Sequence, residues 1–177
     1  MGRIFLTSDL HFCHDKDFVW NARRFQAIDE MNEAIVKRFN EVVAPDDIVY
    51  ILGDIMLNDN EKGEKYLSQL NGELHIVLGN HDTSARVEVY KKYAVEITYA
   101  TLIKYKKKSF YLSHYPTLTA NEGDNKMVYN LHGHTHQTET FNDTYKHMYH
   151  VGVDSHDCYP VLLDDIIEEI KQRKELS

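Results

Sequence analysis

The sequence has few residues of the kinds that would indicate a secreted or membrane protein. Two cysteines, Cys13 and Cys158, lie far apart among 177 residues, and this suggests neither a disulfide framework nor a CxxC zinc site. No apolar run approaches the roughly 20 residues of a membrane helix. The opening segment also lacks the basic and then apolar layout of a signal peptide. We therefore expect free thiols and a cytoplasmic protein without a membrane partner.

Positive charge is also scarce, since 20 Lys and Arg residues face 28 Asp and Glu residues. The resulting formal net charge of -8 argues against a broad nucleic-acid-binding surface. Internal repeats, low-complexity tracts and a recognisable linker are absent too, so we expect one domain over residues 1–177 with a buried core. Histidine, in contrast, is abundant at 11 residues, and its positions need an explanation.

Hydrophobic patterning in the first half alternates between strands and helices. Apolar, β-branched segments at residues 3–9, 47–54 and 73–82 are typical of strands that end in polar residues. Between them, residues 28–43 place apolar side chains on one helical stripe, and a shorter helix is expected at about residues 61–70. This alternation favours parallel strands, for which ligands collect beyond the carboxyl ends.

The second half changes character. Residues 94–116, 127–134 and 145–154 are predicted to form strands joined by turns, mostly antiparallel, with Lys106 to Lys108 at a hairpin tip. Residues 162–177 predict a final helix, because acidic residues come early and basic residues late, which matches the helix dipole.

Five short polar clusters follow these apolar segments, in the order DLH, GD, GNHD, SH and GHTH. They contribute Asp9 and His11, Gly53 and Asp54, Gly79 to Asp82, Ser113 and His114, and Gly133 to His136. One cluster alone is a weak signal, because a strand-end Asp or His is usually a cap or a solvated residue. The ordered set, from residue 4 to about residue 160, resembles the calcineurin-like metallophosphoesterase superfamily. With SDLHFCH and RRF, the chain is similar to its small single-domain bacterial and phage phosphoesterases.

The resemblance implies an α/β fold of two packed mixed β-sheets flanked by helices, a four-layer αββα sandwich. It also implies a binuclear metal centre, in which Asp9, His11 and His136 hold one ion, Asn80, His114 and His134 hold the other, and Asp54 bridges both. Two ions about 4 Å apart repel each other, so a shared carboxylate and a bridging hydroxide are needed between them. Manganese or iron is expected, and zinc is compatible, because the ligands are carboxylate, amide and imidazole without thiolate.

The expected reaction is hydrolysis of a phosphate ester by direct attack of a metal-bound hydroxide, since metal binding lowers the pKa of water. The resemblance implies that His81 is the catalytic residue that contacts the phosphate and protonates the leaving oxygen. Asp82 is expected either to tune His81 or to cap a helix that begins near Thr83. His14 and Arg24 are candidate substrate-binding residues, although a surface role is an open alternative for each.

The remaining histidines have structural interpretations. His132 is expected to stay with its strand and bind no metal, because Gly133 can take backbone angles closed to other residues and turn His134 and His136 toward the ions. Structural roles are also expected for His75, His147, His150 and His156.

The expected function is therefore a metal-dependent phosphodiesterase or phosphatase that acts on a small phosphate ester, such as a phosphodiester or nucleotide. With no room for a cap domain, selectivity would come from loops at about residues 12–26, 55–62 and 115–126. Two alternatives stay open: a non-catalytic scaffold with this fold, and a nuclease that cuts short single-stranded ends. No stable nucleic-acid complex is expected, given the acidic balance.

Overall fold

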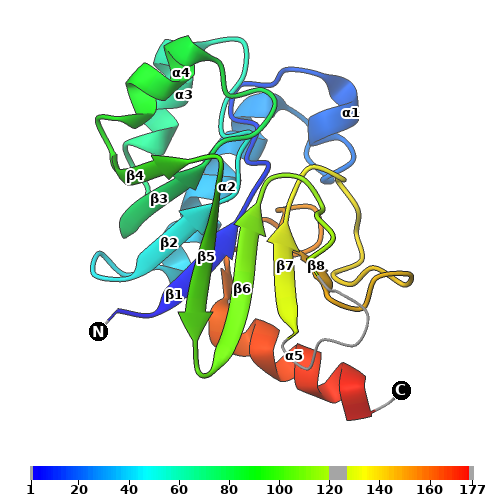
Figure 1. Ribbon diagram of the computed structural model, residues 1–177. Coiled ribbons are helices and arrows are strands. Elements are labelled where there is room, and N and C mark those ends of the chain that lie inside the picture. Colours follow the sequence, from blue (N-terminus) through cyan, green and yellow to red (C-terminus); the bar gives the residue numbers. More distant parts are fainter. Residues whose placement is uncertain (1, 120–126, 176–177) are drawn as a thin grey trace.

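Two β-sheets form the centre of the structure, a computed structural model that describes residues 2–119 and 127–175 (Figure 1). The first sheet has the strand order β4-β3-β2-β1-β9. Its strands are β1 (Ile4–Thr7), β2 (Ile48–Ile51), β3 (Glu73–Val77), β4 (Ala94–Thr98) and β9 (Val161–Leu162). β1, β2 and β3 run parallel, as the sequence predicts. β4 is also parallel to β3, although its residues belong to the half predicted to be mostly antiparallel, and β9 pairs antiparallel with β1.

The second sheet has the order β5-β6-β7-β8. Its strands are β5 (Ala100–Tyr105), β6 (Lys108–Ser113), β7 (Val128–His132) and β8 (Met148–His150). Only β5 and β6 are antiparallel, joined by a tight turn in which Lys106 and Lys107 have φ angles of 47° and 64°. This bears out the predicted hairpin tip.

The prediction of a mostly antiparallel second half is wrong, because β6, β7 and β8 are parallel neighbours. The connections between them, residues 114–127 and 133–147, are each long enough for the crossover of about a dozen residues that parallel strands need. Both sheets therefore contain parallel strands, and both are mixed.

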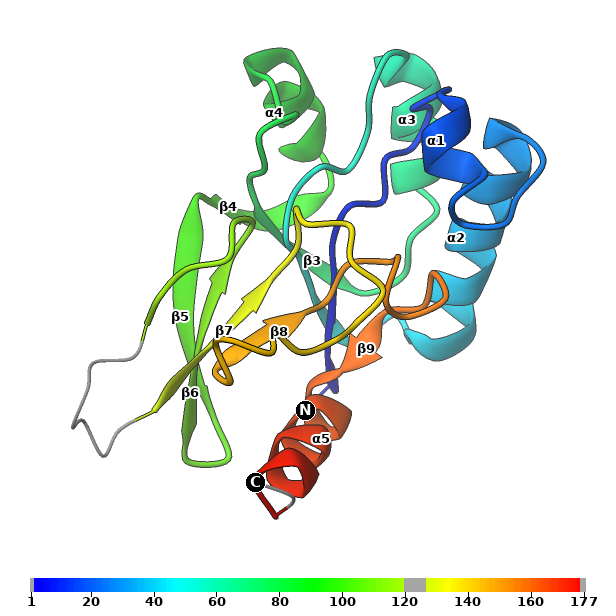
Figure 2. The same cartoon turned by 90° about the vertical axis from the view of Figure 1, so that its right-hand side faces the viewer.

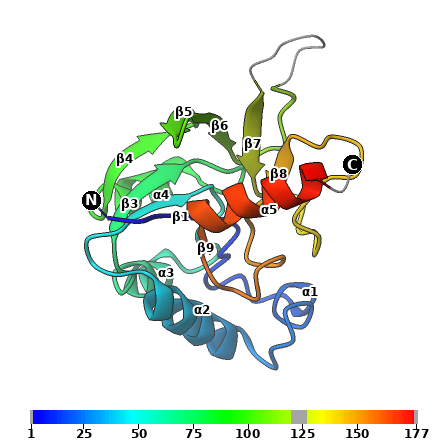
Figure 3. The same cartoon turned by 90° about the horizontal axis from the view of Figure 1, so that it is seen from below.

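Helices flank this pair of sheets. The structure contains α1 (Asp17–Trp20), α2 (Ile28–Val42), α3 (Asn60–Leu67), α4 (Ser84–Tyr90) and α5 (Leu163–Glu175). Figure 3 shows α2 and α3 on the side of the first sheet that faces away from the second sheet. The apolar stripe of α2 packs there through Met31, Ile35 and Phe39, which are all buried against outward residues of β1 to β3. None of the helices in the described ranges is long and apolar enough to span a bilayer.

A second core lies between the sheets. It contains Leu6 and Val77 of the first sheet and Leu52, which directly follows β2. These side chains pack against Phe110 and Leu131 of the second sheet. Each buried side chain of this kind stabilises the fold by about 1.5–3 kcal/mol relative to leaving it exposed. The fold is thus two packed mixed sheets flanked by helices, as expected. Both cysteines are buried free thiols.

The carboxyl ends of β1, β2 and β3 and of the parallel strands of the second sheet reach the same region (Figure 2). An isolated parallel bridge between Ser8 and Gly152 joins the two sheets there, one residue or two beyond β1 and β8. The loops that follow the strands, with their polar clusters, consequently converge.

Candidate metal centre

The loops after β1 and β2 run side by side. The backbone N–H of Asp9 donates to the carbonyl of Gly53, and that of His11 donates to the carbonyl of Asp54, each at 3.0 Å. These two contacts extend the parallel pairing of β1 and β2 beyond the sheet and fix the DLH cluster against the GD cluster. The first two polar clusters of the sequence are therefore one local structure.

Five of the predicted metal ligands have left-handed backbone conformations. The φ angles are 58° at Asp9, 52° at His11, 54° at Asp54, 69° at His134 and 48° at His136. A residue other than glycine in this region costs of the order of 1–3 kcal/mol and persists only where surrounding contacts enforce it. These loops are consequently held in place by their hydrogen bonds rather than by local preference.

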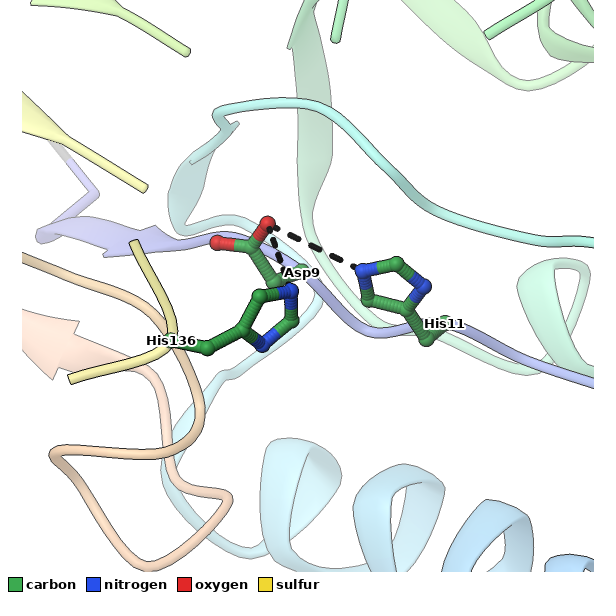
Figure 4. Close-up of side chains that lie close together, drawn as sticks. All are labelled: Asp9, His11 and His136. Carbon is green, nitrogen blue, oxygen red and sulfur yellow. Dashed lines mark ion pairs between the residues drawn. The ribbon is translucent and has the colours of Figure 1, made fainter. Parts of the chain in front are cut away.

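A first ligand group consists of Asp9, His11 and His136, whose side chains converge from two loops (Figure 4). The Nε2 atoms of His11 and His136 each lie 3.9 Å from Oδ1 of Asp9. Both Oδ1 of Asp9 and Nε2 of His11 are buried and have no hydrogen-bond partner. Unsatisfied polar atoms are rare in protein interiors, so the space between them fits a cation.

A second ligand group consists of Asn80, His114 and His134. The Nδ1 atom of His114 lies 2.8 Å from the carbonyl of Leu52 and can only donate to it. In the neutral ring, Nε2 therefore presents a lone pair. That atom lies 2.9 Å from Oδ1 of Asn80 and 3.2 Å from Nδ1 of His134. With the proton on Nδ1, Nε2 of His114 and Oδ1 of Asn80 are two acceptors in contact, and a cation between such atoms would stabilise them.

Asp54 lies between the two groups. Its Oδ2 is 3.8 Å from Nε2 of His11 in the first group and 3.5 Å from Nε2 of His114 in the second. Asp9, Asp54 and His114 also offer ligand atoms that all lie within 4.8 Å of one another. The carboxylate therefore lies within 4 Å of a ring nitrogen of each group.

Burial controls the protonation of these side chains. It raises the pKa of Asp9, against the opposing influence of His136 and of the hydrogen bond from Ser8 Oγ at 2.5 Å. It lowers the pKa of His11 well below its usual value, and it also lowers the pKa of His134. Imidazoles with lowered pKa values are neutral near pH 7, which is the form that binds metals.

His81 lies beside Asp54 and reaches solvent. Its Nε2 is 3.9 Å from Oδ2 of Asp54, and its side chain is 43% exposed. The backbone N–H of His81 donates to Oδ1 of Asp54 at 2.9 Å, and Arg86 donates to the carbonyl of His81. The main chain is thus held on both sides while the ring faces the open side of the site.

Asp82 fixes the backbone beneath Asp54. Its Oδ2 accepts the N–H groups of Asp54 at 2.9 Å and Gly79 at 2.8 Å, and its Oδ1 accepts the hydroxyl of Tyr90 at 2.7 Å. The N-cap of α4 is Thr83, without a side-chain cap hydrogen bond. The capping role considered for Asp82 is therefore wrong, and its contacts support the loops that present Asp54 and His81.

The two candidate substrate-binding residues differ in position. His14 lies over the first ligand group, with its Nδ1 3.1 Å from Nδ1 of His11 and its ring 6.2 Å from that of His81. Arg24 is exposed and lines a surface hollow beside His136. The structure therefore brings His14 to the site and places Arg24 at its rim.

Sequence reasoning missed Arg23 and Asp154. Oδ2 of Asp154 accepts from Nδ1 of His136 at 2.9 Å, and Oδ1 accepts from Nε of Arg23 at 2.8 Å. Burial alone would raise the pKa of Asp154, but the bonds from His136 and Arg23 outweigh it and lower the pKa, while the bond to Asp154 raises that of His136. Asp154 follows β8 as Asp9 follows β1, and this signal could have identified it. The letters RR do not distinguish Arg23 from Arg24.

His132 ends β7 and belongs to neither ligand group. It is buried, its Nδ1 lies 2.9 Å from the carbonyl of Gly133, and its ring is 5.5 Å from that of His150. The explanation given for Gly133 needs correction, since the left-handed residues are His134 and His136 and not the glycine. A Cβ at position 133 would lie 2.1 Å from Ser8 Oγ and 2.3 Å from Asp9 Oδ2. Glycine is required there because the segment at residue 133 lies so close to Ser8 and Asp9 that no side chain fits.

The four other histidines for which we expected structural roles lie outside both ligand groups. His75 contacts Glu73 and Glu96 on the sheet, and Nε2 of His156 lies 3.0 Å from the carbonyl of His150. His147 and His150 are buried.

Known proteins are similar to this chain over most of its length. An uncharacterized protein of Methanocaldococcus jannaschii is 32% identical over 180 residues, which cover 98% of this chain and 94% of that protein. The gene 66 protein of Mycobacterium phage L5 is 26% identical over 186 residues, which cover 88% of each. These relatives span nearly the whole chain.

Solved structures share the fold. A protein of unknown function from Aquifex aeolicus matches with a TM-score of 0.74 and 25% identity, over 95% of this chain and 99% of that one. Yfce, a phosphoesterase from E. coli, matches with a TM-score of 0.51 and 18% identity, over 85% of this chain and 78% of that one. Residues 3–152 match the family model of the calcineurin-like phosphoesterase superfamily domain. The chain therefore belongs to the calcineurin-like phosphoesterase superfamily.

Proposed function

We propose that the protein is a binuclear metal-dependent phosphoesterase that hydrolyses small phosphate esters, with phosphodiesters and nucleotides as its substrates. The observation that carries this proposal is the position of Asp54. Its carboxylate lies 3.8 Å from a ring nitrogen of the first ligand group and 3.5 Å from one of the second. One carboxylate that faces two sets of ligands is the arrangement that a pair of divalent ions needs.

The side chains present fit such ions. Asp9 and His11 contribute buried atoms without partners, and His114 presents its lone pair to Asn80 and His134. The donors are oxygen and imidazole nitrogen without a thiolate, which supports manganese or iron, with zinc also compatible. Two divalent ions bound there would make water a nucleophile near neutral pH and stabilise charge on the phosphate oxygens.

The chain itself supplies a proton donor for the leaving oxygen. The ring of His81 is half exposed beside Asp54, and its backbone is fixed by Asp54 and Arg86. A histidine in this position can contact a phosphate oxygen and transfer a proton to the departing group. His14, whose ring is 5.2 Å from that of His11, lies over the same side and can donate to the phosphate.

Exposed aromatic rings beside the site support the substrate class. Phe18 is 72% exposed and its ring lies 5.8 Å from that of His14, in an edge-on arrangement. Tyr115 is 50% exposed and its ring lies 4.6 Å from that of His134. One ring therefore adjoins each end of the site. Flat aromatic side chains in such positions can stack on nucleobases.

The test is a comparison of substrates on metal-reconstituted protein. Phosphomonoesters, linear diesters, cyclic nucleotides and short single-stranded oligonucleotides would be assayed with manganese, iron or zinc, before and after chelation. We expect metal-dependent hydrolysis with the highest kcat/KM for a small diester or nucleotide. Binding of two ions without hydrolysis of any ester would support the scaffold alternative instead, and a preference for the oligonucleotide would support the nuclease.

A further inference from the structure

The side chain of Arg23 is buried in the loop before α2. It is 3% exposed, although its neighbour Arg24 is exposed. Its guanidinium makes a two-pronged contact with Asp154, from Nε to Oδ1 at 2.8 Å and from the NH2 nitrogen to Oδ2 at 3.1 Å. A planar guanidinium matches a carboxylate in this way, whereas a lysine ammonium keeps the charge without the paired contact.

Arg23 also holds the loop that carries Asp9 and His11. Its NH2 nitrogen donates to the carbonyl of Asp9 at 2.8 Å, and its NH1 nitrogen donates to the carbonyl of Leu10 at 3.2 Å. Asp9 and His11 are left-handed at φ angles of 58° and 52°. Hydrogen bonds to the two carbonyls between them help to keep the loop in this unfavourable conformation.

Asp154 also accepts a hydrogen bond from His136, so it connects Arg23 to this histidine. Its Oδ2 accepts from Nδ1 of His136 at 2.9 Å, which assigns the ring proton to Nδ1 and leaves Nε2 facing Oδ1 of Asp9 at 3.9 Å. Carboxylates that orient histidine ligands in this manner strengthen metal binding by about 10- to 100-fold. All three members of the first ligand group are therefore connected to Arg23.

The second ligand group is held differently. His114 is oriented by the carbonyl of Leu52, and Asn80 and His134 contact His114 directly. In the described part of the chain, no hydrogen bond joins this group to Arg23 or Asp154. An indirect link remains, because the backbone N–H of His134 donates to Oδ2 of Asp9 at 2.9 Å and Arg23 holds the carbonyl of Asp9. Loss of Arg23 should consequently affect the first half of the site much more than the second.

We propose that Arg23 is a positioning residue, which acts through Asp154 and the carbonyls of Asp9 and Leu10 to build chiefly the metal position of the first ligand group. This inference rests on the proposed binuclear function. The hydrogen bonds that Arg23 makes to Asp154 and to backbone carbonyls do not involve the proposed ligand atoms. Its buried positive charge, which would repel a metal ion, is neutralised by Asp154.

The test is titration of metal-free protein with Mn²⁺ by isothermal titration calorimetry, with ion counting by mass spectrometry. We expect the wild type to bind two ions and His136→Gln to lose one binding step, which marks the first ligand group. Arg23→Met and Asp154→Asn should each weaken that same step by about 10- to 100-fold and change the other step much less. The double variant should lose no more affinity in that step than the single variant with the larger loss, because Arg23 and Asp154 act as a unit.

Arg24→Met is the matched control, since it removes an exposed arginine from the same loop. It should bind both ions as the wild type does. Arg23→Lys should weaken the same binding step less than Arg23→Met does, but should not reach the wild-type affinity. Circular dichroism and thermal unfolding of the metal-free proteins separate a binding defect from a folding defect, and Asp154→Asn, which preserves shape, replaces Arg23→Met if the latter does not fold.

Two results would overturn the inference: unchanged affinity for both ions in the tested variant, or equal weakening of both. A wild type that binds fewer than two ions would instead contradict the proposed binuclear function, so the two failures are distinguishable.

Discussion

The backbone N–H of His81 donates to Oδ1 of Asp54 at 2.9 Å, while Oδ2 of the same carboxylate faces both ligand groups. The residue proposed to join the ions thus also fixes the residue proposed to protonate the leaving group. An amide at position 54 would retain an oxygen for the His81 contact and remove only the charge.

For this reason the Asp54→Asn variant should fold normally but bind each of the two ions more weakly, by about 100-fold or more, with a matching loss of turnover. Metal content after gel filtration and kcat at saturating Mn²⁺ provide the measurement. Asp46→Asn, which changes an exposed carboxylate before β2, is the control. Retention of two ions and near-normal turnover in the Asp54 variant would contradict its bridging position.

His81→Ala should retain both ions and lose turnover by about 10²- to 10⁴-fold, because it removes a proton donor and not a ligand. The loss should be smaller for a nitrophenolate leaving group, which departs without a proton, than for an alkoxide. His75→Ala, in β3 and on the glutamate-lined side of the sheet, serves as control. Equal losses for the two leaving groups would indicate that His81 acts by electrostatic stabilisation alone.

The three histidines of LHGHTH should behave differently when each is replaced by glutamine. His132→Gln should keep both ions and most activity, since the ring of His132 is buried against His150. His134→Gln and His136→Gln should each lose one ion and nearly all turnover, because they belong to different ligand groups. Titration with Mn²⁺ distinguishes them, and a metal deficit in the His132 variant would refute the assignment.

Gly133→Ala should damage the first ligand group without changing a ligand. The added methyl would lie 2.1 Å from Ser8 Oγ and 2.3 Å from Asp9 Oδ2, so Asp9 must move. We expect a loss of about 1–3 kcal/mol in the free energy of unfolding and weaker binding of one ion. In the control Gly63→Ala, the atoms nearest to the methyl belong to the side chain of Met56, and metal binding should not change. Normal Mn²⁺ affinity in the Gly133 variant would argue against the close approach.

Phe18→Ala and Tyr115→Ala should raise KM for a nucleoside p-nitrophenyl diester by about 5- to 100-fold, the range expected for one lost stacking contact. The methyl p-nitrophenyl diester shares the leaving group but has no base, so its KM should change little. Tyr99→Ala removes a more exposed tyrosine, 83% accessible, and is the control. Equal changes for both diesters would exclude a role in base binding.

Sequence patterns pointed to most of the candidate site because its residues follow strands directly. Asp9, Asp54 and His114 each come within three residues of a strand end, where a change from apolar to polar is easily recognised. The parallel pairing of β6 with β7 was not predicted, since an alternating pattern is the same for either direction. The length of residues 114–127 was the only available indication.

The inward turn of Arg23 could not be predicted for a different reason. Arg23 and Arg24 are chemically identical neighbours, and the left-handed φ of 65° at Arg24 is part of the backbone geometry that separates their directions. Such a conformation depends on contacts made across the fold, including the ion pair between Arg23 and Asp154, 131 residues apart. Local patterns carry no information about it.

The left-handed conformations of Asp9, His11, Asp54, His134 and His136 set folding stability against function at the same positions. Glycine would relieve the backbone at each of them and remove the side chain that the site needs. Selection for heat resistance alone, without an activity screen, should therefore enrich glycine at these positions. An evolutionary history under such selection would erase the metal centre while it improved the protein's thermal tolerance.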